Sequence, residues 1–102
     1  MTGLFGLRDG EIEKIAGVLR TEASIREAMV FGSRALGNFK PASDVDIALK
    51  GDISHDSVAR LSYLLNEETD MPYRFDLVDY SKIRLEKLRD HIDSVGRTIY
   101  KI

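Results

Sequence analysis

The sequence contains no cysteine, only two prolines and no long apolar run. The absence of cysteine excludes disulfide bonds and thiolate zinc sites. No apolar stretch approaches the roughly 18 residues that a membrane-spanning helix needs. The N-terminus, MTGLFGLRDG, has neither the basic start nor the apolar core of a signal peptide. We therefore expect a cytoplasmic protein that has no membrane partner.

An excess of charge of one sign is also missing. Fifteen Lys and Arg residues stand against 17 Asp and Glu residues, which gives a net charge of -2. Such a chain does not attract nucleic acid through its overall field, so we expect no direct nucleic-acid partner. A length of 102 residues, 43% of them hydrophobic and 31% charged, fits one folded domain that spans residues 1–102.

The hydrophobic spacing predicts an α/β domain in which helices cover a small mixed β-sheet. Alternation with a period of two residues indicates a strand at Val45–Leu49, and helical spacing indicates a first helix at residues 10–23. Residues Leu85, Leu88, Ile92 and Val95 form the apolar stripe of a late helix that Gly96 ends. The other expected elements are a strand at Glu27–Phe31, a helix N-capped by Ser54, a strand at Tyr73–Val78, the late helix N-capped by Ser81, and an edge strand at Thr98–Ile102.

Three aspartates are the candidate metal ligands. Asp44 and Asp46 stand two residues apart on one strand, so their side chains share a face, with Cα atoms about 7 Å apart. Asp76 interrupts the strand YRFDLV in the same way. If the two strands pair, the carboxylates can hold two Mg²⁺ ions about 4 Å apart, which suits in-line attack on phosphorus. Taken singly, Asp44 could cap a turn, Asp46 could be an exposed strand residue, and Asp76 could face solvent on an edge strand.

The stretch Gly32-Ser33-Arg34 follows a buried strand and is the candidate nucleotide-binding turn. Without a Cβ, Gly32 lets the backbone approach a ligand closely. Ser33 offers a hydroxyl and a helix-start position suited to phosphate, and Arg34 offers a guanidinium that can fork to phosphate oxygens. An ordinary strand-to-helix turn is the alternative interpretation.

Three further polar residues have simpler interpretations. Asp79 lies at a strand end before Ser81, where a turn or cap role is favoured over a metal role. His55, beside the Ser54 cap, is expected to be an exposed residue at a helix start. His91 neighbours Ile92 in the late helix and is expected to pack at the boundary of the core.

Together, GSRALG at 32–37, SDVDI at 43–47 and Asp76 within a strand resemble the minimal nucleotidyltransferase (MNT) group of the DNA polymerase beta superfamily. The resemblance covers most of the chain and implies a polymerase-beta-like fold. The sequence departs from the group at Leu36, where many relatives carry a second arginine, which leaves Arg34 as the expected phosphate contact.

The resemblance implies transfer of a nucleoside monophosphate, AMP from ATP, to a hydroxyl group. Asp44, Asp46 and Asp76 would bind two Mg²⁺ ions, Asp76 would also help deprotonate the acceptor, and Gly32 and Ser33 would hold the triphosphate. Proteins of this kind resemble the antitoxin half of modules whose other half is a helical HEPN toxin, in some cases AMPylated on tyrosine.

The length of the chain bears on the acceptor and on the assembly. The segment after Asp76 is long enough for only one helix and one strand, so we expect the acceptor on another polypeptide, in a hetero-oligomer or a homodimer. Two alternatives remain open: a non-catalytic antitoxin that neutralises a HEPN-like partner by binding it, and an aminoglycoside-type small-molecule transferase that works as an oligomer.

Overall fold

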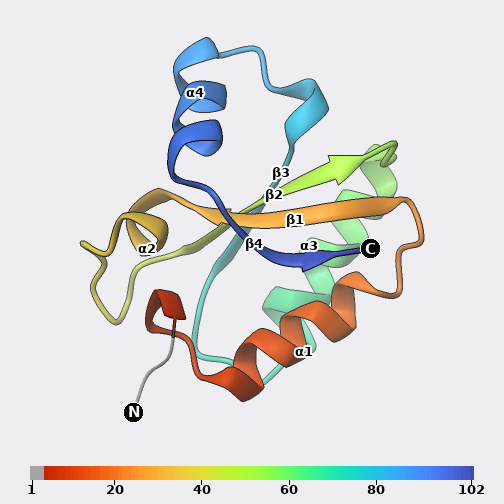
Figure 1. Ribbon diagram of the computed structural model, residues 1–102. Coiled ribbons are helices and arrows are strands. Elements are labelled where there is room, and N and C mark those ends of the chain that lie inside the picture. The colour runs from red at the N-terminus through yellow and green to blue at the C-terminus, as the bar shows by residue number, and fades with distance from the viewer. Residues whose placement is uncertain (1–3) are drawn as a thin grey trace.

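The computed structural model describes residues 4–102. In this part of the chain four strands form one mixed sheet in the order β3-β2-β1-β4. Strand β1 (Ile25–Phe31) pairs antiparallel with β2 (Val45–Gly51) and with β4 (Arg97–Lys101), whereas β2 and β3 (Phe75–Asp79) run parallel. The structure confirms the expected mixed sheet and the position of the last strand at its edge (Figure 1).

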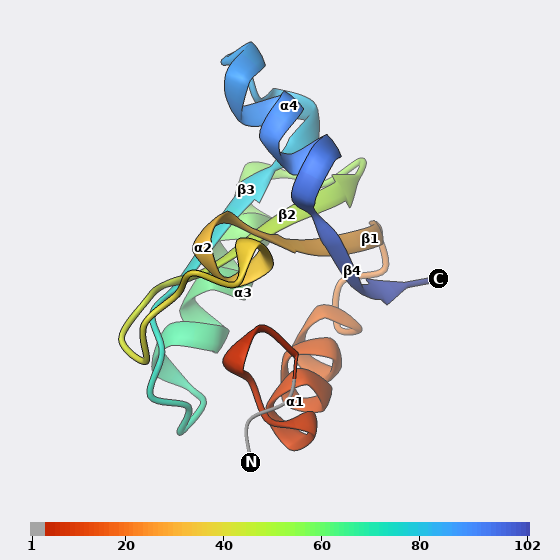
Figure 2. The same ribbon diagram turned by 60° about the vertical axis from the view of Figure 1, so that its left-hand side comes forward.

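Helices cover both faces of the sheet, because the strands are apolar on both sides over much of their length. Helices α1 (Asp9–Leu19) and α3 (His55–Glu67) lie on one face, and α4 (Glu86–Val95) lies on the other (Figures 1 and 2). The larger core between the sheet and the first pair includes Ile15, Leu19, Val30, Val45, Ile47, Leu49, Leu61, Leu65 and Phe75. The smaller core under α4 consists of Met29, Phe31, Ala48, Ile83 and Ile92.

The alternation between these two cores decides where the polar residues of β2 point. Val45, Ile47 and Leu49 enter the core shared with α1 and α3, so Asp46 and Ala48 face α4. None of the helices within residues 4–102 combines the length and the apolar character that crossing a bilayer requires.

Of the two predicted N-caps, one is confirmed and one is wrong. Ser54 caps α3 as predicted, since its Oγ accepts a hydrogen bond from the Ser57 backbone nitrogen at 3.1 Å. The predicted cap at Ser81 is wrong. Asp79 Oδ1 accepts hydrogen bonds from the backbone nitrogen and hydroxyl of Ser81 and opens a short 3-10 helix, η2 (Tyr80–Lys82). Helix α4 therefore starts later, and Leu85, expected in its buried stripe, is 65% exposed.

A side chain of α3 fixes the start of β3. The Asn66 amide nitrogen donates to the Phe75 carbonyl oxygen at 2.9 Å, and the Phe75 backbone nitrogen donates to Asn66 Oδ1 at 2.8 Å. Asn66 thus pairs with this edge strand as a neighbouring strand would. Because Asp76 is the next residue, the contact also sets the backbone that carries this carboxylate.

Candidate active site

Two of the three predicted carboxylates lie side by side. In the parallel pairing of β2 with β3, Asp46 is the register partner of Asp76, and on its other side Asp46 is the partner of Phe31 at the end of β1. Both aspartates follow a residue of the larger core, Val45 and Phe75, so both face the side of the sheet that carries α4. The structure therefore brings Asp46 and Asp76 together on neighbouring strands.

Asp44 is close to this pair without belonging to the sheet. It directly precedes β2, it is exposed, and its charge acts on the Asp46 carboxylate. Within residues 4–102, no group of three or more His, Asp or Glu side chains is gathered closely enough to hold a metal ion as the side chains stand. The three aspartates share one region, and binding a cation there requires their carboxylates to turn toward one another.

The electrostatics of Asp46 reflect this crowding. Its pKa is raised above the ordinary value of 3.8, first by burial, then by the negative charges of Asp76 and Asp44, while His91 opposes the shift. A carboxylate that is both desolvated and flanked by like charges is destabilised in its ionised form. A bound cation would relieve that strain, and such a group is typical of functional sites.

Gly32 begins the short helix α2 (Gly32–Leu36) at the end of β1, with a positive φ of 73°. A Cβ atom at Gly32 would overlap Oδ2 of Asp46. From the sequence, the missing Cβ at Gly32 is predicted to let a ligand approach the backbone closely. In the structure, the space beside Gly32 is the space that the Asp46 carboxylate occupies.

Gly32→Ala is expected to disturb the site more than the fold. The left-handed conformation costs an L-residue about 1–2 kcal/mol, and the new methyl group must also displace the Asp46 carboxylate. Gly37→Ala is the matched control, because Gly37 has a φ of 88° and open space where its Cβ would stand. Thermal melts should show similar losses in both variants, and calorimetry should show weakened Mg²⁺-dependent ATP binding only in Gly32→Ala. Equal binding by the two variants would contradict the assignment.

His91 is the site neighbour that the sequence analysis missed. The Gly32 backbone nitrogen donates a hydrogen bond to His91 Nε2 at 3.0 Å, which joins α4 to the glycine turn. The ring also packs edge-on against Phe31, with ring centroids 6.1 Å apart. Core-boundary packing was expected, and the tie to the glycine turn was not. Nothing in the local sequence signals it, because His91 reaches Gly32 from a helix 59 residues further along the chain.

Ser33 and Arg34 differ in their burial and contacts in α2. Ser33 is half-buried directly after Gly32, and its contact with phosphate remains a prediction. Arg34 is only 2% exposed, and its guanidinium donates to the backbone carbonyls of Phe5, Pro41 and Ser43. The structure thus gives Arg34 an internal role in place of the predicted phosphate contact. A buried guanidinium needs several acceptors, and here backbone carbonyls supply them.

The simpler interpretations of Asp79 and His55 are confirmed. Asp79 caps a turn through Ser81, and His55 is exposed as the first residue of α3. Asp79 Oδ2 is buried and has no hydrogen-bond partner among residues 4–102, and it lies 3.9 Å from the Lys82 Nζ atom.

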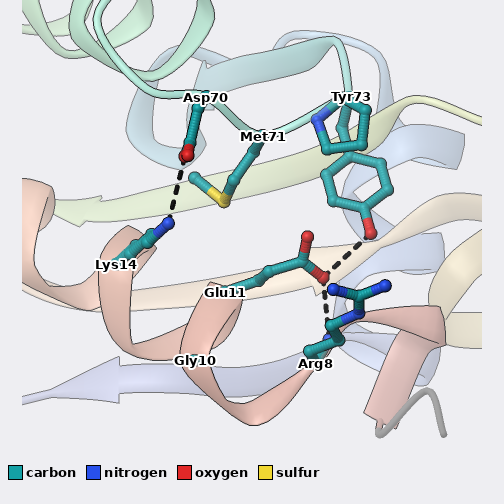
Figure 3. A pocket seen from close by; sticks show the side chains of 8 residues that line it. Arg8, Gly10, Glu11, Lys14, Asp70, Met71 and Tyr73 are labelled. Carbon is teal, nitrogen blue, oxygen red and sulfur yellow. Dashed lines mark hydrogen bonds and ion pairs between the residues drawn. The ribbon is translucent and has the colours of Figure 1, made fainter.

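A pocket of about 400 Å³ lies between α1 and the loop before β3, and none of the predicted site residues lines it. Figure 3 shows the Lys14–Asp70 ion pair on one side and the Tyr73 hydroxyl pointing to Glu11 on the other. The pocket is therefore distinct from the acidic region described above.

Comparison with known proteins identifies the family. Residues 13–102 match the family described as "Polymerase beta, Nucleotidyltransferase". A toxin-antitoxin structure with AMP-PNP has a TM-score of 0.74 and 23% identity, over 89% of this chain and 73% of that chain. A tri-AMPylated Shewanella oneidensis HEPN toxin in complex with its MNT antitoxin has a TM-score of 0.67 and 21% identity, over 89% and 70%. A toxin-antitoxin MntA-HepT structure has a TM-score of 0.66 and 21% identity, over 89% and 70%.

No curated protein matches the sequence significantly. At such low identities the structural matches establish the fold, and they confirm the predicted resemblance to MNT antitoxins in complexes with HEPN toxins. The family match extends over most of the chain. This chain belongs to the polymerase beta nucleotidyltransferase family.

Proposed function

We propose that this protein is a Mg²⁺-dependent nucleotidyltransferase that transfers AMP from ATP to a hydroxyl group of a partner protein, as the antitoxin of a HEPN-type toxin. The observation that carries the proposal is the register of Asp46 with Asp76, beside Gly32 and after Asp44. Family membership supports the reaction class. The relatives that contain AMP-PNP, or an AMPylated HEPN toxin with its MNT antitoxin, support the nucleotide and the partner.

The donor set fits magnesium. Asp44, Asp46 and Asp76 offer only hard carboxylate oxygens, the ligands that Mg²⁺ prefers. The raised pKa of Asp46, caused by burial and by its two acidic neighbours, indicates repulsion that a divalent cation would relieve. These three residues would hold the ions, and bound magnesium would neutralise phosphate charge and favour in-line attack at phosphorus.

The residues of the chain supply the remaining chemistry. The Gly32 turn, tied to His91, and the Ser33 hydroxyl hold the triphosphate at the end of β1. The acceptor hydroxyl oxygen attacks the α-phosphorus while the Asp76 carboxylate accepts its proton. The bond between the α-phosphorus and the bridging oxygen breaks, and pyrophosphate leaves. The new bond joins AMP to the acceptor oxygen, so the atoms and charges balance.

A non-catalytic antitoxin is the second candidate function. It is favoured by the observation that, within residues 4–102, the acidic side chains are not already gathered into a metal-binding group. In this case the protein silences a HEPN-like partner by covering it, and the nucleotide site is vestigial.

The test uses the protein encoded by the neighbouring gene. The two proteins are mixed with ATP and Mg²⁺, and the partner is weighed by intact mass spectrometry. We expect the partner to gain the mass of one or more AMP groups, and to gain none when EDTA is present. A partner that is silenced without any gain in mass would establish the binding function instead. If the partner is neither modified nor silenced, the antitoxin assignment is wrong.

A further inference from the structure

The buried guanidinium of Arg34 is bonded to the loop that leads to Asp44. Its Nε and Nη2 atoms donate to the Ser43 carbonyl oxygen at 3.2 and 2.9 Å, and Nη2 also donates to the Pro41 carbonyl oxygen at 3.3 Å. Nη1 donates to the Phe5 carbonyl oxygen at 2.8 Å. Every nitrogen of the side chain is therefore engaged with backbone.

Two aromatic rings hold the guanidinium in place. Its central carbon lies 5.0 Å from the centroid of the Phe39 ring and 4.9 Å from that of Tyr73. Tyr73 is itself fixed, because its hydroxyl donates to Glu11 Oε1 at 2.9 Å (Figure 3). Cation–π contacts of this kind strengthen when water is excluded, and Arg34 is almost fully buried.

Asp44 lies between two fixed backbone points. On one side the Ser43 carbonyl accepts from Arg34, and on the other the Val45 backbone nitrogen donates to the Arg74 carbonyl oxygen at 2.8 Å. The loop before Ser43 is closed by the Lys40 backbone nitrogen, which donates to Ser43 Oγ at 2.8 Å. The Ser43 backbone nitrogen also donates to the Lys40 carbonyl oxygen at 2.9 Å, so this turn is closed by its own hydrogen bonds, and Arg34 ties the turn to the interior of the fold.

We propose that Arg34 is a positioning residue that sets the backbone of Asp44 and so prepares this carboxylate to share a cation with Asp46. The inference rests on the proposed function, and it gives the arginine of the GSRALG stretch a role behind the site. Lysine is a poor replacement, because its single ammonium nitrogen cannot reach the Phe5, Pro41 and Ser43 carbonyls from three separate positions, and it lacks the flat guanidinium that stacks on aromatic rings.

Arg34→Lys is compared with Arg60→Lys, which makes the same exchange at a surface arginine that pairs with Glu22. The first measurement is amide hydrogen exchange over residues 38–45. We expect exchange to quicken in this segment at least about tenfold in Arg34→Lys, the scale of one lost charged hydrogen bond. Arg60→Lys should leave the segment unchanged. Unchanged exchange in Arg34→Lys would overturn the inference.

The second measurement links Arg34 to Asp44. Calorimetry gives the Mg²⁺ concentration needed for half-maximal ATP binding, in the wild-type background and in Asp44→Asn. We expect Arg34→Lys to raise that concentration about tenfold in the wild-type background, and to add nothing once Asp44 is replaced, because the two residues act on one ligand. Equal shifts in both backgrounds would show a general loss of structure and refute the positioning role.

A second variant keeps the hydrogen bonds of Arg34, so the inference can still be tested if Arg34→Lys does not fold. Phe39→Leu removes one of the two rings, and we expect smaller changes in the same direction in both measurements. No change in either measurement counts against the inference. If the wild-type protein binds no Mg²⁺-ATP, the proposed function fails, and hydrogen exchange alone then decides whether Arg34 fixes the segment before Asp44.

Discussion

Asp76→Asn should abolish AMP transfer to the partner while leaving the partner complex intact. Asp76 is exposed on the edge strand β3, so its replacement by an amide of the same shape removes little packing. It removes the carboxylate that accepts the acceptor's proton, and loss of a general base typically slows a reaction about 10²–10⁴-fold. Weakened metal binding would add to that loss. Intact mass spectrometry of the partner measures the rate, and gel filtration measures the complex.

Asp52→Asn is the matched control for this experiment. Asp52 is also exposed, but it directly follows β2 at the end opposite Asp46, so its replacement should leave transfer at the wild-type rate. If Asp76→Asn modifies the partner as fast as the control does, Asp76 has no part in the mechanism. If Asp76→Asn also loses the complex, its carboxylate contributes to docking, and its assignment to the chemical step loses support.

Replacing Asp44 and Asp46 together by Asn should eliminate Mg²⁺-dependent ATP binding and, without metal, raise the melting temperature. The two changes remove the negative charges that a cation needs, and they also remove repulsion within the site. Calorimetry in the presence of Mg²⁺ measures binding, and thermal melts in EDTA measure stability. Unchanged affinity for Mg²⁺-ATP in the double variant would refute the metal assignment.

The pH dependence of the melts tests whether the charge of Asp46 destabilises the folded protein. Burial and the charges of Asp76 and Asp44 raise the pKa of Asp46 above 3.8. The folded state binds the proton of the Asp46 carboxyl more tightly than the unfolded state does. Protonated Asp46 therefore makes its whole contribution to stability below pH 3.8, and this contribution is lost as the pH rises through the raised pKa. The wild-type melting temperature should therefore fall over that range relative to Asp46→Asn. Parallel curves for the two proteins would mean that Asp46 is not strained.

The sequence predicted well what depends on local periodicity. Alternation along Val45–Leu49 shows which residues enter the core, and therefore which face carries Asp46. The same reasoning for Asp76 needed one assumption, that the two strands pair, and the parallel register bears it out. The cap at Ser54 was also predictable, since its bond to Ser57 lies within a single helical turn.

The contacts that the sequence could not predict join separate elements of the fold. Arg34 reaches Phe5 and Ser43, Asn66 fastens the start of β3, and His91 meets Gly32. Each involves a polar side chain whose partner is a backbone group brought close only by the folded sheet, so no spacing rule signals it. The predicted N-cap at Ser81 is wrong for a local reason. Asp79 lies two residues earlier, and its carboxylate accepts a hydrogen bond from the backbone nitrogen of Ser81.

The strand order has a consequence for how the molecule assembles. The inner strand β1 pairs with β4, so Glu27 pairs with Lys101, which lies near the other end of the sequence. Pairings between such distant residues raise the contact order and slow folding, because a long loop must close before the contact rewards it. Helix α4 directly precedes β4, so His91 reaches Gly32 only when most of the chain is available. During synthesis on the ribosome, the glycine turn therefore gains its last support after β2 and β3 have already emerged.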